Sequence, residues 1–261
     1  MSRKKAHSGI DYWKIVRLFI SIGLMIFLLF AISNKLNETV GSIKISIDSK
    51  GEKKKLITEK EVRAILKYEM GYDVQIAEIS QLNLFKLEKV LANNDRIDDV
   101  KVYLDKHNFL NVNIVQKEPI VRIDNVNAPD YYLDYKGDRV PVTDTYRVPV
   151  VTGNVDAYSS DFHKSKKNNL NDVLALAQKV HDDAFLNALV EQIHIDEKNE
   201  ITIIPKVGRD KILIGQIQDL DEKIYKLKTY YEHGVKKIGL DRFDELDLKY
   251  ADMMIGRQKD T

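Results

Sequence analysis

The sequence predicts an α+β protein in which a single N-terminal transmembrane helix precedes two folded modules. Three patterns predict it: an uncharged apolar run over residues 18–33, a β-α-α-β-β order over residues 41–118, and a β-rich order with flanking helices over residues 119–255. The apolar run approaches the length that spans a bilayer. The later segments alternate with the periods of half-buried strands and amphipathic helices.

Composition excludes several classes of protein. Hydrophobic residues make up 44% of the 261 residues, which is too many for a disordered chain. The absence of Cys excludes disulfide scaffolds, Cys-based zinc sites and thiol catalysis. A net charge of +1 gives no support to nucleic-acid binding, which favours a strongly basic domain.

Charge is distributed unevenly around the apolar run. Residues 1–17 hold five basic side chains and one acidic one, a net charge of +4, so the remainder carries −3. The uncharged run continues to Ile32, and with Ile15 and Val16 it would form a helix of roughly 27 Å, close to the thickness of a hydrocarbon core. The basic flank predicts a cytoplasmic tail at 1–17 and an extracytoplasmic body. The residues expected to face lipid are Leu18, Phe19, Leu24, Phe27, Leu28 and Phe30.

Two other interpretations of this run are a buried core helix and a cleaved signal peptide. Ala31 and Ser33 have the spacing of small residues at a cleavage site. The run is longer than the apolar region of a typical signal peptide, and it has no polar face. We therefore favour an uncleaved, single-pass anchor.

The first module begins with a strand in which apolar and polar residues alternate over Gly41 to Asp48. Thr58 and Glu61 have the spacing of a capping box before a short helix, and Asn83 is placed to cap a second helix. Two alternating segments, 100–104 and 110–114, then predict a hairpin. Two short helices on a three-stranded sheet form a compact unit.

The second module continues with a hairpin, whose turn contains Gly137. Asn171 and Asp219 are expected to cap two helices. Further strands are expected at 193–196, 201–204, 211–217 and 235–240, a last one over Leu246 to Ile255, and a mobile tail at 256–261.

No catalytic or metal-binding motif is recognisable. The local groupings of histidine with carboxylate are His181 with Asp182 and Asp183, and His194 with Asp196; neither has the spacing of a metal site. Nucleotide-binding and nucleophilic serine motifs are absent. The sequence predicts a non-enzymatic protein without cofactor or metal, and binding becomes the expected function.

The order of elements resembles the FtsQ/DivIB cell-division proteins of bacteria. The similarity lies in the hairpin segments Val100–Leu104 and Leu110–Ile114 and in the junction Glu118–Arg122. It implies that 41–118 is a POTRA domain and that 119–255 is the β domain that follows it. It also implies FtsB/FtsL-like partners, which dock on the terminal strand region of the family.

Carried over by position, this docking region points to four residues: Leu246, Leu248, Tyr250 and Met253. An edge strand exposes unpaired N–H and C=O groups, to which another chain can add a strand. The alternative is that the four side chains face the core. The edge of the first sheet, near Ile43 to Ile47, is a second candidate surface.

The leading hypothesis is a single-pass scaffold of the divisome in the inner membrane, with periplasmic or extracytoplasmic domains that help couple partners to septal wall synthesis. One alternative is a POTRA-type chaperone or transport component for outer-membrane or secreted proteins. Another is a membrane-anchored wall enzyme, which would need a charged cleft around His181 or His194.

Overall fold

The computed structural model describes most of the chain between residues 12 and 258. The described ranges are 12–36, 38–49, 55–125, 128–142, 146–165, 167–208, 210–250 and 252–258. Most of the predicted cytoplasmic tail, the turn at 50–54 and the last three residues of the predicted mobile tail lie outside them. The described residues divide into two compact units: unit 1 draws on 1–46, 59–93 and 100–114, and unit 2 on 47–58, 94–99 and 115–261.

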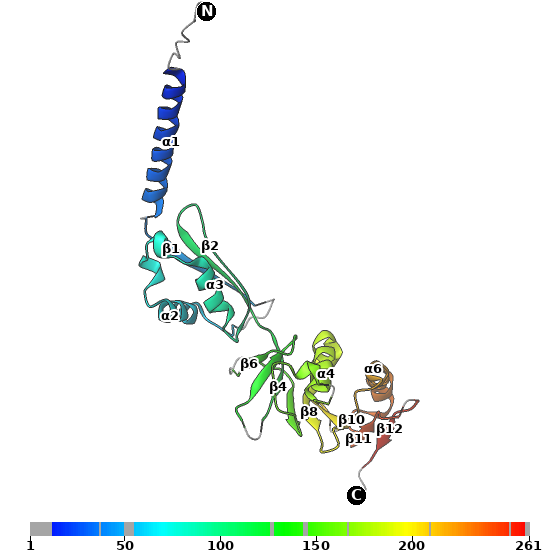
Figure 1. Cartoon of the computed structure of the whole chain (residues 1–261). Helices are drawn as coiled ribbons and strands as arrows, with labels where there is room; N and C mark the ends of the chain where they lie inside the picture. Colours follow the sequence, from blue (N-terminus) through cyan, green and yellow to red (C-terminus); the bar gives the residue numbers. More distant parts are fainter. Residues whose placement is uncertain are drawn as a thin grey trace, which may run out of the picture. The chain divides into compact units, whose positions relative to one another are not determined.

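Helix α1 (Tyr12–Leu36) contains the apolar run (Figure 1). Its stretch Ile15–Ser33 is the one helical segment of the described residues that is long and apolar enough to cross a membrane, and none of it is buried. A helix that is apolar all round and lacks a protein cover needs an apolar medium. This excludes the buried core helix and is consistent with a single-pass membrane protein. The six residues expected to face lipid are more than half exposed: Leu18, Phe19, Leu24, Phe27, Leu28 and Phe30.

Unit 1 has the predicted β-α-α-β-β order around a three-stranded sheet. Its elements are β1 (Ser42–Asp48), α2 (Glu59–Met70), the 3-10 turns η1 (Val74–Ile76) and η2 (Ile79–Gln81), α3 (Leu84–Ala92), β2 (Ile97–Leu104) and β3 (Phe109–Gln116). The strands lie in the order β1-β3-β2, so β1 is an edge strand. The predicted apolar stripes face inward, since Val62, Leu66, Leu87 and Leu91 are buried.

Local signals set the ends of the two helices of unit 1. Asn83 caps α3 as expected, because its side-chain oxygen accepts a hydrogen bond from the Lys86 N–H at 2.9 Å. Gly71, which follows α2, has φ of +76°, a conformation that glycine adopts without a steric cost.

Unit 2 contains a nine-stranded mixed sheet. Its strands are β4 (Pro119–Ile123), β5 (Tyr131–Asp134), β6 (Arg139–Pro141), β7 (Val150–Gly153), β8 (Val190–Ile195), β9 (Ile201–Pro205), β10 (Lys211–Gly215), β11 (Glu245–Asp247) and β12 (Ile255–Arg257). They lie in the order β12-β11-β10-β9-β8-β7-β4-β5-β6. The β5–β6 hairpin is as predicted, with Gly137 at φ +86° in its turn.

Helices lie in two of the three parallel connections of this sheet, and β5 and β6 lie in the third, between β4 and β7. β7 pairs in parallel with β4 and with β8, and β10 pairs in parallel with β11. The 3-10 turn η3 (Phe162–Lys164), α4 (Leu170–Asp182) and α5 (Ala184–Leu189) lie between β7 and β8; α6 (Leu220–Thr229), the π-helical turn η4 (Tyr230–Gly234) and α7 (Val235–Ile238) lie between β10 and β11. Figure 1 shows α4 beside β4 and β8, and α6 beside β10 and β11. Buried residues of α4 and α6 join those of the strands in one hydrophobic core.

Helix starts and one expected strand differ from the prediction. α4 begins at Leu170, before Asn171, so Asn171 is not its cap. Asp219 precedes α6 but makes no side-chain capping bond. The strand expected at 235–240 is wrong, because 235–238 forms α7 as the continuation of α6 and η4. Val235 and Ile238 are three residues apart, a spacing that shares one face of a helix but not of a strand, and Gly239, at φ +89°, ends the run.

The single terminal strand expected over Leu246 to Ile255 is also wrong. β11 ends at Asp247, and β12 returns antiparallel to it at Ile255–Arg257. The neighbour β10 ends at Gly215, which has φ of +69°, so the chain after Leu248 has no strand to continue alongside. Two residues of the predicted mobile tail, Gly256 and Arg257, therefore belong to the sheet.

Candidate functional site

The two ends of the nine-stranded sheet are its candidate binding edges. β6 lies at one end and β12 at the other. An edge strand can accept a strand from another chain through its free backbone groups, unless proline, side chains or charges block it. The residues around each edge therefore decide which edge is open.

β6 is a blocked edge. Pro141 has no backbone N–H to donate. The Arg139 N–H donates to the hydroxyl of Tyr158 at 3.2 Å, so a side chain already occupies the place of a partner strand. Both features oppose strand addition.

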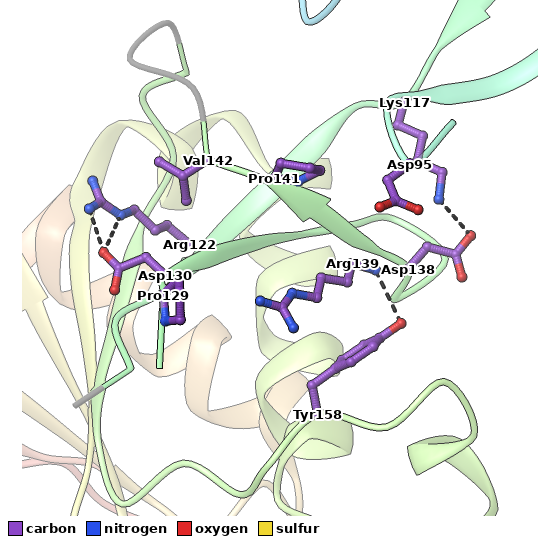
Figure 2. Close-up of a pocket in the computed structure, with 10 residues that line it drawn as sticks. All are labelled: Asp95, Lys117, Arg122, Pro129, Asp130, Asp138, Arg139, Pro141, Val142 and Tyr158. Atoms are coloured by element: carbon purple, nitrogen blue, oxygen red, sulfur yellow. Dashed lines mark hydrogen bonds and ion pairs between the residues drawn. The ribbon is translucent and has the colours of Figure 1, made fainter. Parts of the chain in front are cut away.

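A polar cavity of about 880 Å³ lies beside β6 (Figure 2). Arg122 donates to Asp130 Oδ2 from Nε at 3.1 Å and from Nη2 at 2.5 Å. This guanidinium lowers the pKa of Asp130. Lys117 Nζ lies 3.2 Å from Asp138 Oδ2. These charges are satisfied within the protein, so the cavity does not concentrate a single sign of charge.

The Arg139 guanidinium lies at the same cavity and stacks on an aromatic ring. Its central carbon is 4.7 Å from the centroid of Tyr131. The Tyr131 hydroxyl is buried, and burial raises its pKa to about 12. The stack holds the cation by its interaction with the ring face.

β12, like β6, is paired on one side, but the segment 252–254 that leads into it lines an apolar groove. In the described part of the chain its strand neighbour is β11 alone. The groove has a volume of about 430 Å³ and is lined by Tyr225, Lys226, Thr229, Tyr230, His233, Gly234, Lys237, Asp252, Met253 and Met254. Two of the lining side chains, Tyr225 and Met253, are 71% and 55% exposed. Exposed apolar surface of this kind marks interaction sites.

Two polar contacts hold this edge to the sheet and to α6. Arg257 Nη2 donates to Asp247 Oδ2 at 2.8 Å, which ties β12 to β11. Asp247 is fully buried, so this bond satisfies a charge that has lost its water. Lys226 Nζ donates to the backbone oxygen of Tyr250 at 2.5 Å and fastens the connecting segment to α6.

The four residues predicted to bind a partner fall into two pairs. Leu246 and Leu248 are fully buried in the core of unit 2, and the Leu248 N–H donates to the Leu213 carbonyl at 2.9 Å. Tyr250 and Met253 are 47% and 55% exposed, and Met253 lines the groove. The first pair therefore supports the edge from inside, and the second pair is accessible.

Sequence reasoning missed the part of the groove that comes from α6 and η4. The apolar stripe of α6 is Leu220, Ile224 and Leu227, and Tyr225 lies off that stripe. An aromatic residue on the polar face of a helix was the available signal. The contribution of η4 had no signal, since a π-helical turn has no sequence pattern that we can recognise.

The histidines singled out from sequence lie elsewhere and do not converge. His181 Nε2 is 3.8 Å from Glu118 Oε1, and its ring packs against Tyr135. His194 Nδ1 is 3.1 Å from Thr152 Oγ1. Neither histidine lines the cavity beside β6 or the groove beside β12. Across the described ranges, no three His, Asp or Glu side chains are grouped to hold a metal ion.

The fold defines a class of α+β protein in which two folded units follow one candidate membrane span. Comparison with family models gives its family: the model described as FtsQ/DivIB, C-terminal related, matches residues 118–256, more than half of the chain. A POTRA-like domain model matches residues 39–115. The chain therefore belongs to the FtsQ/DivIB family, and the family and the α+β fold predicted from the sequence are confirmed.

These matches indicate a division-associated scaffold that contains a POTRA domain. Both matched types are non-catalytic scaffolds, and the family implies protein–protein interactions in the divisome. No curated protein matches the chain significantly.

Proposed function

We propose that this protein is a non-enzymatic scaffold of the bacterial divisome, anchored in the inner membrane by residues 18–33. In this proposal the tail at 1–17 is cytoplasmic, and the POTRA domain at 41–118 and the β domain at 119–255 are periplasmic or extracytoplasmic. The +4 charge of the tail supports the orientation, because basic residues are retained on the cytoplasmic side. Family membership supports the role in division.

FtsB/FtsL-like division proteins dock on the β12 edge by strand addition. The observation that carries this proposal is that β12 is paired on one side and borders an exposed apolar groove, whereas β6 is blocked. Backbone hydrogen bonds along β12 would supply affinity, and the groove would receive side chains of the added segment. Captured partners are thereby coupled to septal wall synthesis.

The exposed residues Tyr250 and Met253 make direct contacts in this proposal. Leu246 and Leu248 act indirectly, by holding β11 in the core so that β12 has a fixed neighbour. Proline at Leu248 is consequently a poor test of docking. It would remove the hydrogen bond to Leu213 and damage the sheet itself.

A double variant of the groove, Tyr225→Ser with Met253→Ser, tests the docking site. Both side chains are exposed, so the fold should survive. We expect capture of the FtsB/FtsL-like partner to weaken about tenfold, because two apolar anchors are lost. The measurement is co-purification and titration of the partner with the full chain in detergent.

The matched control is Tyr68→Ser with Phe85→Ser, which removes two exposed aromatic side chains from unit 1. It should capture the partner as the wild type does. Wild-type capture by a correctly folded groove variant would contradict docking at this surface.

Depletion of the protein in its native bacterium separates the division role from the alternative of a POTRA-type chaperone or transport component. Filamentation is expected of a divisome scaffold. Loss of outer-membrane or secreted proteins without filamentation would instead favour the transport role.

A further inference from the structure

A buried carboxylate without a partner lies at the start of β10. Asp210 is 1% exposed, and neither of its carboxylate oxygens has a hydrogen-bond partner within the described ranges. Buried polar groups are nearly always hydrogen-bonded, and a bare buried charge is very costly. A group of this kind needs a physical explanation.

Two further buried groups of the same corner lack hydrogen bonds. They are the hydroxyls of Tyr230 and Tyr231, which both come from the π-helical turn η4. Asp210 acts electrostatically on both tyrosines. A Cβ on Gly234 would lie 2.8 Å from the Tyr230 ring, so a glycine in this turn leaves room for that ring. π-helical turns are rare, and those that occur often lie at functional sites.

The ionised groups that act on Asp210 are carboxylates. Asp241 and Asp244 precede β11, and they add repulsion to the burial that raises the pKa of Asp210 to about 6. Of the basic residues that the structure describes near this corner, Lys211 is exposed on the opposite side of the strand, and Arg257 binds Asp247. Glu245, the β11 residue that is paired with Lys211, is itself acidic.

This cluster connects the elements that carry the open edge. The Lys211 N–H donates to the Asp244 carbonyl at 2.9 Å where β10 and β11 begin to pair. Tyr230 belongs to the cluster through its hydroxyl, and it also lines the groove beside β12. A change of charge at Asp210 therefore acts on the packing that fixes β11 and β12.

We propose that Asp210 is a proton-operated lock on the corner formed by β10, β11, β12 and η4. Protonated, it is a neutral group whose burial costs far less than the burial of a charge, and the corner stays closed. Ionised, it is an unpaired buried charge among two other carboxylates, and opening of the corner exposes it to water. The stability of the docking edge thus rises as the surrounding solution becomes acidic.

The direction of this pH effect follows from the pKa of Asp210 in the closed corner and its pKa in the open one. A pKa of about 6 in the closed corner exceeds the ordinary value of 3.8 that applies when Asp210 is exposed. The closed state is therefore most stable below 3.8 and loses stability as the pH rises through about 6. From pH 5 to pH 8, the equilibrium between open and closed corner should shift about tenfold toward the open form.

Hydrogen exchange of the full chain in detergent tests the lock without any partner protein. Backbone amides of β11 and β12, corrected for their intrinsic exchange rates, should show about tenfold less protection at pH 8 than at pH 5. Amides of β4 and β5 should show no such change. In Asp210→Asn the pH dependence at β11 and β12 should disappear.

A second variant protects the test against misfolding of Asp210→Asn. Asp241 is exposed, so Asp241→Asn should fold, and loss of its repulsion should move the midpoint of the pH dependence to lower pH. An unchanged midpoint in this variant, or equal protection of the wild type at both pH values, would overturn the proposal. Recovery of protection at pH 8 on addition of Mg²⁺ or Ca²⁺ would also overturn it, by identifying a cation as the missing partner.

Discussion

The two edge strands of the nine-stranded sheet differ in whether they can accept another strand. At β6, Pro141 lacks an N–H, and the N–H of Arg139 donates its hydrogen bond to the Tyr158 hydroxyl. At β12, the outer side of the strand is unpaired within the described residues, and an apolar groove lies beside it. A proline and one hydroxyl are enough to close a sheet edge, so an edge that lacks them is available for binding.

The cavity beside β6 and the groove beside β12 show the same contrast between a closed edge and an open one. The cavity at β6 contains ion pairs that satisfy one another, and surface pairs of this kind contribute little stability. The groove at β12 keeps Tyr225 and Met253 exposed, although burying them would be favourable at about 25 cal/mol per Å². Retention of exposed apolar surface at the open edge is what a docking site requires.

The largest effect is expected from detaching the open edge. Arg257→Met removes the cation that is hydrogen-bonded to Asp247 and leaves this fully buried carboxylate without it. The loss should destabilise the β11–β12 pair by about 1–3 kcal/mol, since a buried acceptor loses its partner. Hydrogen exchange of the β12 amides measures the loss, and partner capture should weaken with it.

A nearby ion pair provides the control for Arg257→Met. Lys249 and Glu200 lie 3.3 Å apart, and their side chains are 36% and 40% exposed. Lys249→Met should therefore cost less than about 1 kcal/mol. An equal cost in both variants would mean that burial of Asp247 does not decide the strength of the β12 attachment.

Much of the fold was predictable because its signals are local. The turn residue Gly137 predicted the β5–β6 hairpin, and Asn83 predicted the start of α3 from its capping chemistry. The parallel pairs of β7 with β4 and β8 were not predicted. They join segments that are far apart in the sequence, and no periodicity within a segment reveals its distant neighbour.

The candidate site was predicted only in part. Alternation over Leu246, Leu248 and Tyr250 indicated a strand near the C-terminus, but the structure ends β11 at Asp247 and makes Ile255–Arg257 the edge. Three residues are too few to show a period. The location of Gly256 in the sheet depends on a tertiary contact, because a Cβ there would lie 2.7 Å from the Phe243 ring.

An intermediate effect is expected from opening the closed edge. Tyr158→Phe removes the hydroxyl that accepts the Arg139 N–H and should cost about 1 kcal/mol. Combined with Pro141→Val, which restores a backbone donor on an exposed residue, it should make β6 a pairing edge. We expect the double variant to self-associate with increasing concentration, which light scattering of the full chain in detergent can measure. A double variant that remains as monodisperse as the wild type would show that β6 is closed by something other than these two residues.

The smallest effect is expected from the cavity beside β6. Arg122→Gln removes the pair with Asp130, but the two side chains are 41% and 24% exposed, so the cost should stay below about 1 kcal/mol. The pair lowers the pKa of Asp130 below its ordinary value of 3.8, so its stabilisation is present above that value and lost as the pH falls further. Protection of the β4 amides from hydrogen exchange, followed from neutral to acidic pH, should lose this contribution in Arg122→Gln and retain it in Lys249→Met. A loss above about 2 kcal/mol would mean that the closed edge depends on its charges. A small loss of stability would mean that Pro141 and Tyr158 close the β6 edge. The difference between β6 and β12 would then depend on which backbone groups of the two strands are free to pair.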